Sequence, residues 1–476
     1  MGSINILSQS SSIILTLILS FIFVTSGIYY SRKHKGLNNY LVANRNVGVF
    51  SLTASFVSSA LGAWILFGPA SAATWGGIGA VIGYSLGTAF PLFILIYLGE
   101  NFRRAFPKSK TLIEVVRLKF GKQLFKLILF LTVFYMSIFL IAEVTAVSIL
   151  VKYISGTSLW ITALIVVISS LVYTLYGGLR ASIFTDSIQF VIFIILLIIT
   201  LSYLISFNSN QLSFDFINLN KPILLSSKYV PNFTAGLTFF IAVAATNLFH
   251  QGNWQRVYAA KSNYVLKKSL LFSFFIIIPI VFFMGFSGLI AVSVNSSVVP
   301  DLAFFSLLFK EEVLTLSVMV VILGISLTIS SIDTLINAIS SLIIVDGNKV
   351  IKFKGNYFNL SNYLIIILSV IVFIVASKGL SILYLFLLAD LFCCAAVLTI
   401  FYSFFKKPIS EKNAYISIII GLVVGLLFFP SPDFSKSILV GILFPINLFP
   451  DLVSQSLLFL SFLIATFVPI LTWKIK

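Results

Sequence analysis

The chain contains 476 residues, of which 59% are hydrophobic and only 9% charged, and its formal net charge is +17. Soluble domains carry roughly 25% charged residues, so this composition excludes a soluble globular protein. The basic residues lie in short clusters between apolar runs, as in the cytoplasmic loops of membrane proteins. The net charge therefore does not indicate a nucleic acid partner.

Thirteen apolar segments approach or exceed the roughly 20 residues that a helix needs to cross the hydrocarbon core of a bilayer. They predict an all-α integral membrane protein in which residues 1–476 form a single transmembrane domain. The predicted transmembrane helices comprise residues 11–30, 48–74, 78–99, 123–153, 157–176, 182–206, 232–255, 269–294, 313–345, 360–377, 381–404, 413–430 and 453–473.

The distribution of basic residues predicts the orientation. The first apolar segment has basic residues after it and none before it, the reverse of a secretory signal, so we expect a retained helix with its N-terminus outside. With alternating crossings the C-terminus is cytoplasmic, and all but six of the 31 Lys and Arg residues fall on the cytoplasmic side. The six exceptions are Lys152, Lys221, Lys228, Lys310, Lys378 and Lys436.

Two absences from the sequence bear on function. No Gly-x-x-x-x-Gly-Lys-Ser/Thr phosphate loop occurs, so the chain is not expected to hydrolyse ATP itself. Acids in the predicted outer loops are scattered, which argues against a membrane enzyme. Because no targeting segment is recognised, we expect a bacterial inner membrane, and no obligate protein partner is indicated.

Four acidic residues lie within predicted spans, namely Glu143, Asp186, Asp333 and Asp390. An acid at mid-membrane costs about 2.5–3.5 kcal/mol on insertion scales and commonly marks an ion or substrate pathway. Glu143 and Asp390 could equally be structural acids bonded to a neighbouring helix. Asp186 lies one turn from the predicted inner face, where a snorkelling structural role is also open.

Asp333 belongs to a polar stripe on one helix. Its members are spaced by three and four residues and so share one face; they are Ser330, Asp333, Thr334, Asn337 and Ser341. Hydroxyl, carbonyl and carboxylate oxygens are the ligands that hard cations prefer. The stripe therefore predicts a cation site.

Two further segments are unusual within membrane spans. Small residues, glycine and proline crowd residues 55–69, which predicts either close helix packing or a broken helix whose free carbonyls bind an ion. The second segment, residues 247–256, is rich in amides. Asn247, His250 and Gln251 could bind a polar solute there, although His250 could be a core histidine, and Arg256 is interpreted as an interfacial anchor.

Taken together, these segments resemble the sodium:solute symporter family, which includes bacterial proline, pantothenate, sialic acid and sugar symporters and urea and polyamine transporters. The motifs that carry the resemblance are Tyr40–Arg45, Ser58–Trp64, Thr111–Arg117, Tyr173–Arg180 with Thr185–Asp186, Trp254–Arg256 with Ala259–Lys261, and Ser330–Ser331. The resemblance implies a leucine-transporter-like fold. Two inverted five-helix repeats, residues 48–206 and 232–404, would be flanked by one N-terminal and two C-terminal helices.

The resemblance also implies site residues. The main sodium site would comprise the carbonyls of Ser58, Leu61 and Leu327 and the hydroxyls of Ser330 and Ser331. A possible second cation site would comprise Asp186, Asp333 and Thr334, together with Ser330. Relatives carry a hydroxyl where Asp333 stands, so this second site could hold sodium, hold a proton, or be a buried pair of acids. Substrate contacts are expected from Ala60, Trp64, Asn247, His250 and Gln251.

The resemblance implies a secondary active symporter that couples inward sodium movement to uptake of a small polar organic solute, such as an amino acid, a urea-like compound, a carboxylate or a sugar. Sodium is then the only cofactor expected, and the solute and the lipid bilayer are the expected partners. Two alternatives stay open. One is a proton-coupled or uncoupled carrier of the same fold, and the other is a membrane receptor that senses a solute.

Overall fold

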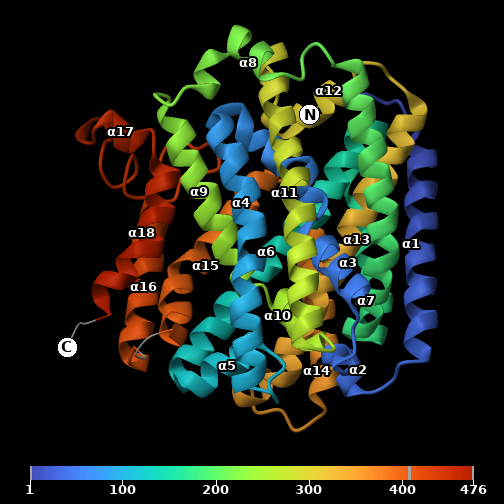
Figure 1. The fold of residues 1–476 in the computed structure, drawn as a ribbon, viewed down its shortest axis with the longest axis vertical. Helices are drawn as coiled ribbons and strands as arrows, with labels where there is room; N and C mark the ends of the chain where they lie inside the picture. Colours follow the sequence, from blue (N-terminus) through green and yellow to red (C-terminus); the bar gives the residue numbers. More distant parts are fainter. Residues whose placement is uncertain (1–2, 406–408, 474–476) are drawn as a thin grey trace.

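The computed structural model describes residues 3–405 and 409–473, and the predicted cytoplasmic residues 406–408 and 474–476 lie outside this range. The described residues are predominantly helical, and strand pairing among them is limited to isolated bridges. This architecture confirms the predicted all-α fold. Figure 1 shows the helices side by side, with α1 at one edge of the bundle and α16 and α18 at the other.

Ten helices among the described residues are long and apolar enough to cross a membrane. They are α1 (Gln9–Arg32), α4 (Gly68–Ala105), α6 (Lys122–Ser155), α7 (Leu159–Phe207), α9 (Val230–Phe249), α11 (Asn263–Val294), α13 (Leu314–Val345), α14 (Tyr357–Ala376), α15 (Ile382–Phe405) and α16 (Glu411–Phe428).

The remaining helices are shorter. The apolar ones are α3 (Val49–Ala60) and α18 (Leu457–Thr472). The connecting helices are α2 (Leu37–Val42), α5 (Leu112–Lys119), α8 (Phe214–Asn220), α10 (Gln251–Ala259), α12 (Ala303–Leu308) and α17 (Asp451–Ser454).

Glycine kinks divide the two longest helices. Gly77 in α4 (φ 60°, ψ −158°) and Gly178 in α7 (φ 59°, ψ −158°) adopt backbone angles that only glycine reaches easily. The 49 residues of α7 would span ~74 Å as one helix, more than twice the ~30 Å hydrocarbon core. Both kinks fall between segments that the sequence predicts as separate helices. The total of thirteen membrane crossings stays a prediction.

The predicted segment 48–74 is a broken helix. Helix α3 ends at Ala60, Leu61 (φ −105°, ψ 85°) and Gly62 are non-helical, and a short 3₁₀ turn, Ala63–Leu66, leads into α4. The Glu143 carboxylate accepts a hydrogen bond of 2.9 Å from the Ala63 N–H. It thereby satisfies a backbone donor that the break leaves without a helical partner.

The predicted helix 232–255 is also broken, although the sequence analysis treats it as continuous. His250 (φ −58°, ψ 107°) separates α9 from α10. Two side chains of α10 replace the lost helical bonds, since Asn253 Nδ2 donates to the Asn247 carbonyl (3.0 Å) and Trp254 Nε1 to the Leu248 carbonyl (2.7 Å). Each predicted repeat therefore begins with an interrupted helix, while the inverted symmetry itself stays a prediction.

Gly62 is required by the carboxylate that stabilises the first break. A Cβ at this position would overlap Glu143, whereas a Cβ on Gly48, at the start of α3, would meet nothing within 4 Å. We expect Gly62→Ala to lower the apparent melting temperature of the detergent-purified protein, because overpacking a filled site costs about 1–3 kcal/mol. Gly48→Ala serves as the matched control and should leave that temperature unchanged. Equal melting temperatures for the two variants would contradict this role of Gly62.

Candidate functional site

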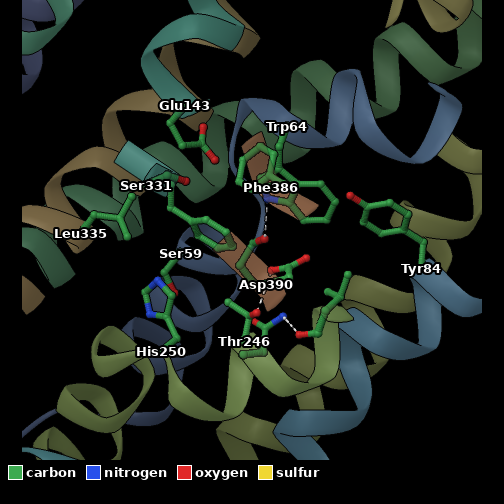
Figure 2. A pocket seen from close by; sticks show the side chains of 14 residues that line it. Ser59, Trp64, Tyr84, Glu143, Thr246, His250, Ser331, Leu335, Phe386 and Asp390 are labelled. Atoms are coloured by element: carbon green, nitrogen blue, oxygen red, sulfur yellow. Dashed lines mark hydrogen bonds between the residues drawn. The ribbon is translucent and has the colours of Figure 1, made fainter. Parts of the chain in front are cut away.

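A central cavity lies where the two broken helices meet the long helices of the bundle. Its empty volume, counted together with its open mouth, is about 540 Å³. Side chains from α3, α4, α6, α9, α13 and α15 and from both helix breaks surround it (Figure 2). The lining residues are Ser59, Ala60, Trp64, Tyr84, Phe139, Glu143, Val243, Thr246, Asn247, His250, Ser331, Leu335, Phe386 and Asp390.

Four of the five residues expected to contact substrate line this cavity: Ala60, Trp64, Asn247 and His250. Gln251, the fifth, points elsewhere. Its Oε1 accepts from the Leu112 N–H (3.1 Å) and its Nε2 donates to Ser341 (3.3 Å). Gln251 therefore links α10 to the start of α5 and to α13.

Two acids left open by the sequence analysis, Glu143 and Asp390, lie in the cavity wall. Glu143 accepts the Ala63 bond described above, and Asp390 Oδ1 accepts a 2.7 Å hydrogen bond from the Thr246 hydroxyl. From the sequence, both residues could be recognised only as acids within predicted spans. The sequence could not show that α6 and α15 turn them toward one cavity.

The sequence analysis did not identify most of the aromatic lining. The Trp64 ring stacks on Tyr84 (centroids 5.4 Å apart), and Phe386 packs edge-on against both Trp64 (6.2 Å) and Phe139 (4.8 Å). Aromatic residues are too common in membrane spans for Tyr84, Phe139 or Phe386 to stand out without a view of helix rotation. Of this group, only Trp64 was suggested by its position beside the broken segment.

The residues expected to form the main sodium site are all buried, and they lie at the end of α3 and on α13: Ser58, Leu61, Leu327, Ser330 and Ser331. Both helices contact Asp186 of α7. Ser58 Oγ donates to the Asp186 carbonyl (3.1 Å), and Ser330 Oγ donates to its carboxylate (2.6 Å). The neighbouring Ser331 lines the cavity, and its hydroxyl has no hydrogen-bond partner among the described residues. A buried hydroxyl with unused lone pairs is compatible with a cation ligand.

Arg256 is fully buried, so its interpretation as an interfacial anchor is wrong. Its Nη2 forms an ion pair of 2.9 Å with Asp186 Oδ2 and donates to the Thr334 hydroxyl (2.8 Å). Its Nε donates to Ser55 Oγ (2.7 Å) and its Nη1 to the Gly252 carbonyl (3.0 Å). The guanidinium therefore lies among oxygens from α3, α7, α10 and α13.

Asp186 is also fully buried, which excludes the snorkelling role considered for it. Together with Thr334 it was expected to form part of a second cation site. The structure places the guanidinium of Arg256 between these two side chains. The positive charge beside Asp186 is therefore supplied by the chain itself.

Asp333, the other acid of that expected site, is held by hydroxyl groups. Its carboxylate accepts hydrogen bonds from Tyr173 (2.6 Å) and Ser182 (2.9 Å), both on α7. Further along the polar stripe, both polar atoms of the Asn337 amide are buried, and neither has a partner within the described part of the chain. The stripe thus faces α7 and the protein interior.

Curated relatives and solved structures agree with this architecture. The chain is 27% identical to the spermidine transporter DUR31 of Candida albicans over 83% of its own length and 74% of the relative's. It is 29% identical to a sodium/glucose cotransporter of Vibrio parahaemolyticus, but over only 37% of this chain and 33% of that one.

A structure of a Na⁺-coupled sialic acid symporter, in a substrate-bound outward-open state, superimposes with a TM-score of 0.71 at 15% identity. The match covers 97% of this chain and 96% of the other. Mhp1, a nucleobase-cation-symport-1 family transporter in a closed conformation, gives a TM-score of 0.56 at 14% identity, over 90% and 93% of the two chains. These likenesses show that the fold is that of transporters.

The model of the sodium:solute symporter family matches residues 40–421. This range contains both broken helices, the central cavity and the Asp186–Arg256 ion pair. The chain is therefore an integral membrane protein that belongs to the sodium:solute symporter family.

Proposed function

We propose that the protein is a secondary active symporter that couples inward movement of sodium to uptake of a small organic solute. The observation that carries this proposal is the buried Ser331 hydroxyl, which has no partner among the described residues and lines the central cavity together with Ser59 and Ala60 at the end of α3. Membership of the sodium:solute symporter family supports sodium as the coupling ion. The names of the relatives, a spermidine transporter and a sodium/glucose cotransporter, support an organic solute.

Sodium would bind between α3 and α13. The carbonyls of Ser58, Leu61 and Leu327 and the hydroxyls of Ser330 and Ser331 are its proposed ligands. Oxygen ligands suit a hard cation that sheds its water, and the carbonyls at a helix break are free to bind one. An ion at this position would hold the end of α3 against α13.

Coupling requires sodium and solute to prefer the same conformation, because a ligand shifts an equilibrium only by its difference in affinity for the two states. Ser331 lines the cavity and is a proposed sodium ligand, and Ser59 and Ala60 of the α3 end line the same cavity. An ion that fixes this end of α3 would therefore also shape the solute site. We propose that both ligands favour the outward-open state and are released to the cytoplasm together.

We further propose that a single sodium ion is coupled in each cycle. Arg256 already donates to Asp186 and Thr334, and a second monovalent cation beside its guanidinium would be repelled. The guanidinium of Arg256 then serves as a fixed cation in place of a second sodium ion at the expected second cation site.

The sodium site is tested by Ser331→Ala and Asp333→Asn in proteoliposomes. We expect Ser331→Ala to raise the sodium concentration for half-maximal uptake about tenfold, equivalent to roughly 1.4 kcal/mol of lost ion binding. Asp333→Asn should raise it further, because it removes a negative charge from the stripe. Ser317→Ala is the control, since that hydroxyl bonds only to the Val313 carbonyl of its own helix. If both test variants kept the wild-type sodium response, the site assignment would be wrong.

The stoichiometry is tested by the sodium dependence of initial uptake rates. One coupled ion predicts a hyperbolic curve with a Hill coefficient close to one. Sodium should accelerate uptake, whereas an imposed proton gradient at constant sodium should not. A sigmoidal curve with a coefficient approaching two would contradict the role assigned to Arg256, and uptake driven equally well by protons alone would favour the proton-coupled alternative.

The Asp186–Arg256 pair is tested by a double-mutant cycle. Arg256→Ala or Asp186→Ala alone leaves a buried charge without its partner, which typically costs about 3–5 kcal/mol. We expect each single variant to lower the apparent melting temperature strongly, and the double variant to recover part of that loss. Additive losses in the double variant would show that the two charges do not depend on each other.

A further inference from the structure

Among the described residues, the lining of the central cavity includes two carboxylates and no lysine or arginine. Glu143 enters it from α6 and Asp390 from α15, and the fourteen lining residues include no permanently cationic side chain. The nearby guanidinium of Arg256 is already engaged by Asp186. The side chains that line the cavity therefore do not neutralise the negative charge of its two carboxylates.

The hydrogen bonds of these acids leave room for a ligand. Glu143 Oε2 accepts from the Ala63 N–H and Asp390 Oδ1 accepts from the Thr246 hydroxyl. One such bond to each carboxylate is recorded among the described residues. Figure 2 shows the two carboxylates at separate places in the cavity wall.

One further polar atom of a lining residue lacks a partner. His250 Nδ1 is buried, with its residue only 7% exposed, and no hydrogen bond to it is recorded among the described residues. The Ser331 hydroxyl is also unpartnered, but it is assigned to sodium above. Buried polar atoms in native proteins are nearly always bonded to protein or water. An unsatisfied ring nitrogen in the same lining as two partly satisfied carboxylates indicates a polar ligand.

The aromatic lining favours a positively charged ligand. Trp64 and Phe386 line the same cavity as the two acids, while the Tyr84 ring stacks on both Trp64 and Phe239. The faces of aromatic rings attract ammonium groups, tryptophan most strongly, while their edges and flat surfaces pack well against methylene groups. Carboxylates and aromatic faces together match a ligand with cationic ends and an apolar middle.

We infer that the solute of this symporter is an aliphatic diamine or polyamine, with one ammonium group bound by Glu143 and another by Asp390. This inference rests on the proposed function. A dication neutralises both acids at once, which offsets the high cost of carboxylates in a low-dielectric site. An anionic solute would be repelled by them, and a sugar would leave both negative charges uncompensated.

Wild-type protein in proteoliposomes provides the first test, with radiolabelled putrescine and spermidine as probes under an inward sodium gradient. We expect sodium-stimulated uptake of at least one of the two amines. Unlabelled n-butylamine should compete at least tenfold more weakly than putrescine, because it carries a single charge. Glucose, proline and urea should not compete. Competition by glucose or proline at lower concentrations than putrescine would overturn the inference.

Glu143→Gln and Asp390→Asn provide the second test. Both variants keep an oxygen that accepts the existing hydrogen bond and remove only the charge. In each variant the preference for putrescine over n-butylamine should fall from tenfold or more toward equality, because one of two ammonium sites is lost. Glu100→Gln is the control, since Glu100 pairs with Arg104 away from the cavity. An unchanged preference in both acid variants would overturn the assignment.

Thermal shift of the purified proteins gives a readout that does not depend on transport. Putrescine should raise the apparent melting temperature of the wild type and of Glu100→Gln, since a ligand that binds only the folded state stabilises it. The shift should be smaller in Asp390→Asn, which keeps the test valid if Glu143→Gln fails to fold. No shift in the wild type at millimolar putrescine would count against the inference.

The two proposals fail in different ways. Amine uptake that is indifferent to the sodium gradient would retain the amine inference and remove sodium symport. Sodium-driven uptake of a neutral solute, with no amine competition, would retain symport and remove the amine inference.

Discussion

The buried ion pair between Arg256 and Asp186 is the interaction on which the centre of the molecule depends. Neither charge reaches solvent, and an isolated charge at this depth would be prohibitively unfavourable. The guanidinium therefore needs its full set of oxygens, and these come from Ser55, Asp186, Gly252 and Thr334. Because those residues belong to different helices, satisfying one side chain fixes the relative positions of α3, α7, α10 and α13.

Glu143 has a comparable role on the other side of the cavity. It stabilises the restart of the broken helix through the Ala63 N–H and presents its carboxylate to the cavity. Gly62 permits this contact because it has no side chain to displace the carboxylate. A ligand that binds Glu143 would thus act directly on the break whose carbonyls are the proposed sodium ligands. This arrangement gives a physical route by which solute and ion could influence each other.

The sequence predicted those features that depend on local composition. Apolar runs located the long helices, and Gly and Pro near Gly62 and Pro69 marked the first break, because such residues weaken a helix wherever they lie. The break at His250 was missed, since it is stabilised by side-chain bonds from Asn253 and Trp254 rather than by a helix-breaking residue.

Arg256 was misinterpreted for a related reason. Hydropathy places an arginine that follows an apolar run at the membrane interface. Only the three-dimensional arrangement shows that Asp186, 70 residues earlier in the chain, lies with its Oδ2 atom 2.9 Å from Nη2 of Arg256. The same reason explains the error for Gln251. Its amide suggested a solute contact, but its position on α10 directs the side chain toward the Leu112 N–H. The residue type predicts which side chains can bind a polar group. The rotation of the helix decides whether such a side chain faces a ligand or a backbone N–H or carbonyl of the protein. Asn247 and Gln251 lie four residues apart across the His250 break, and only Asn247 lines the cavity, although its Nδ2 donates to the Val243 carbonyl.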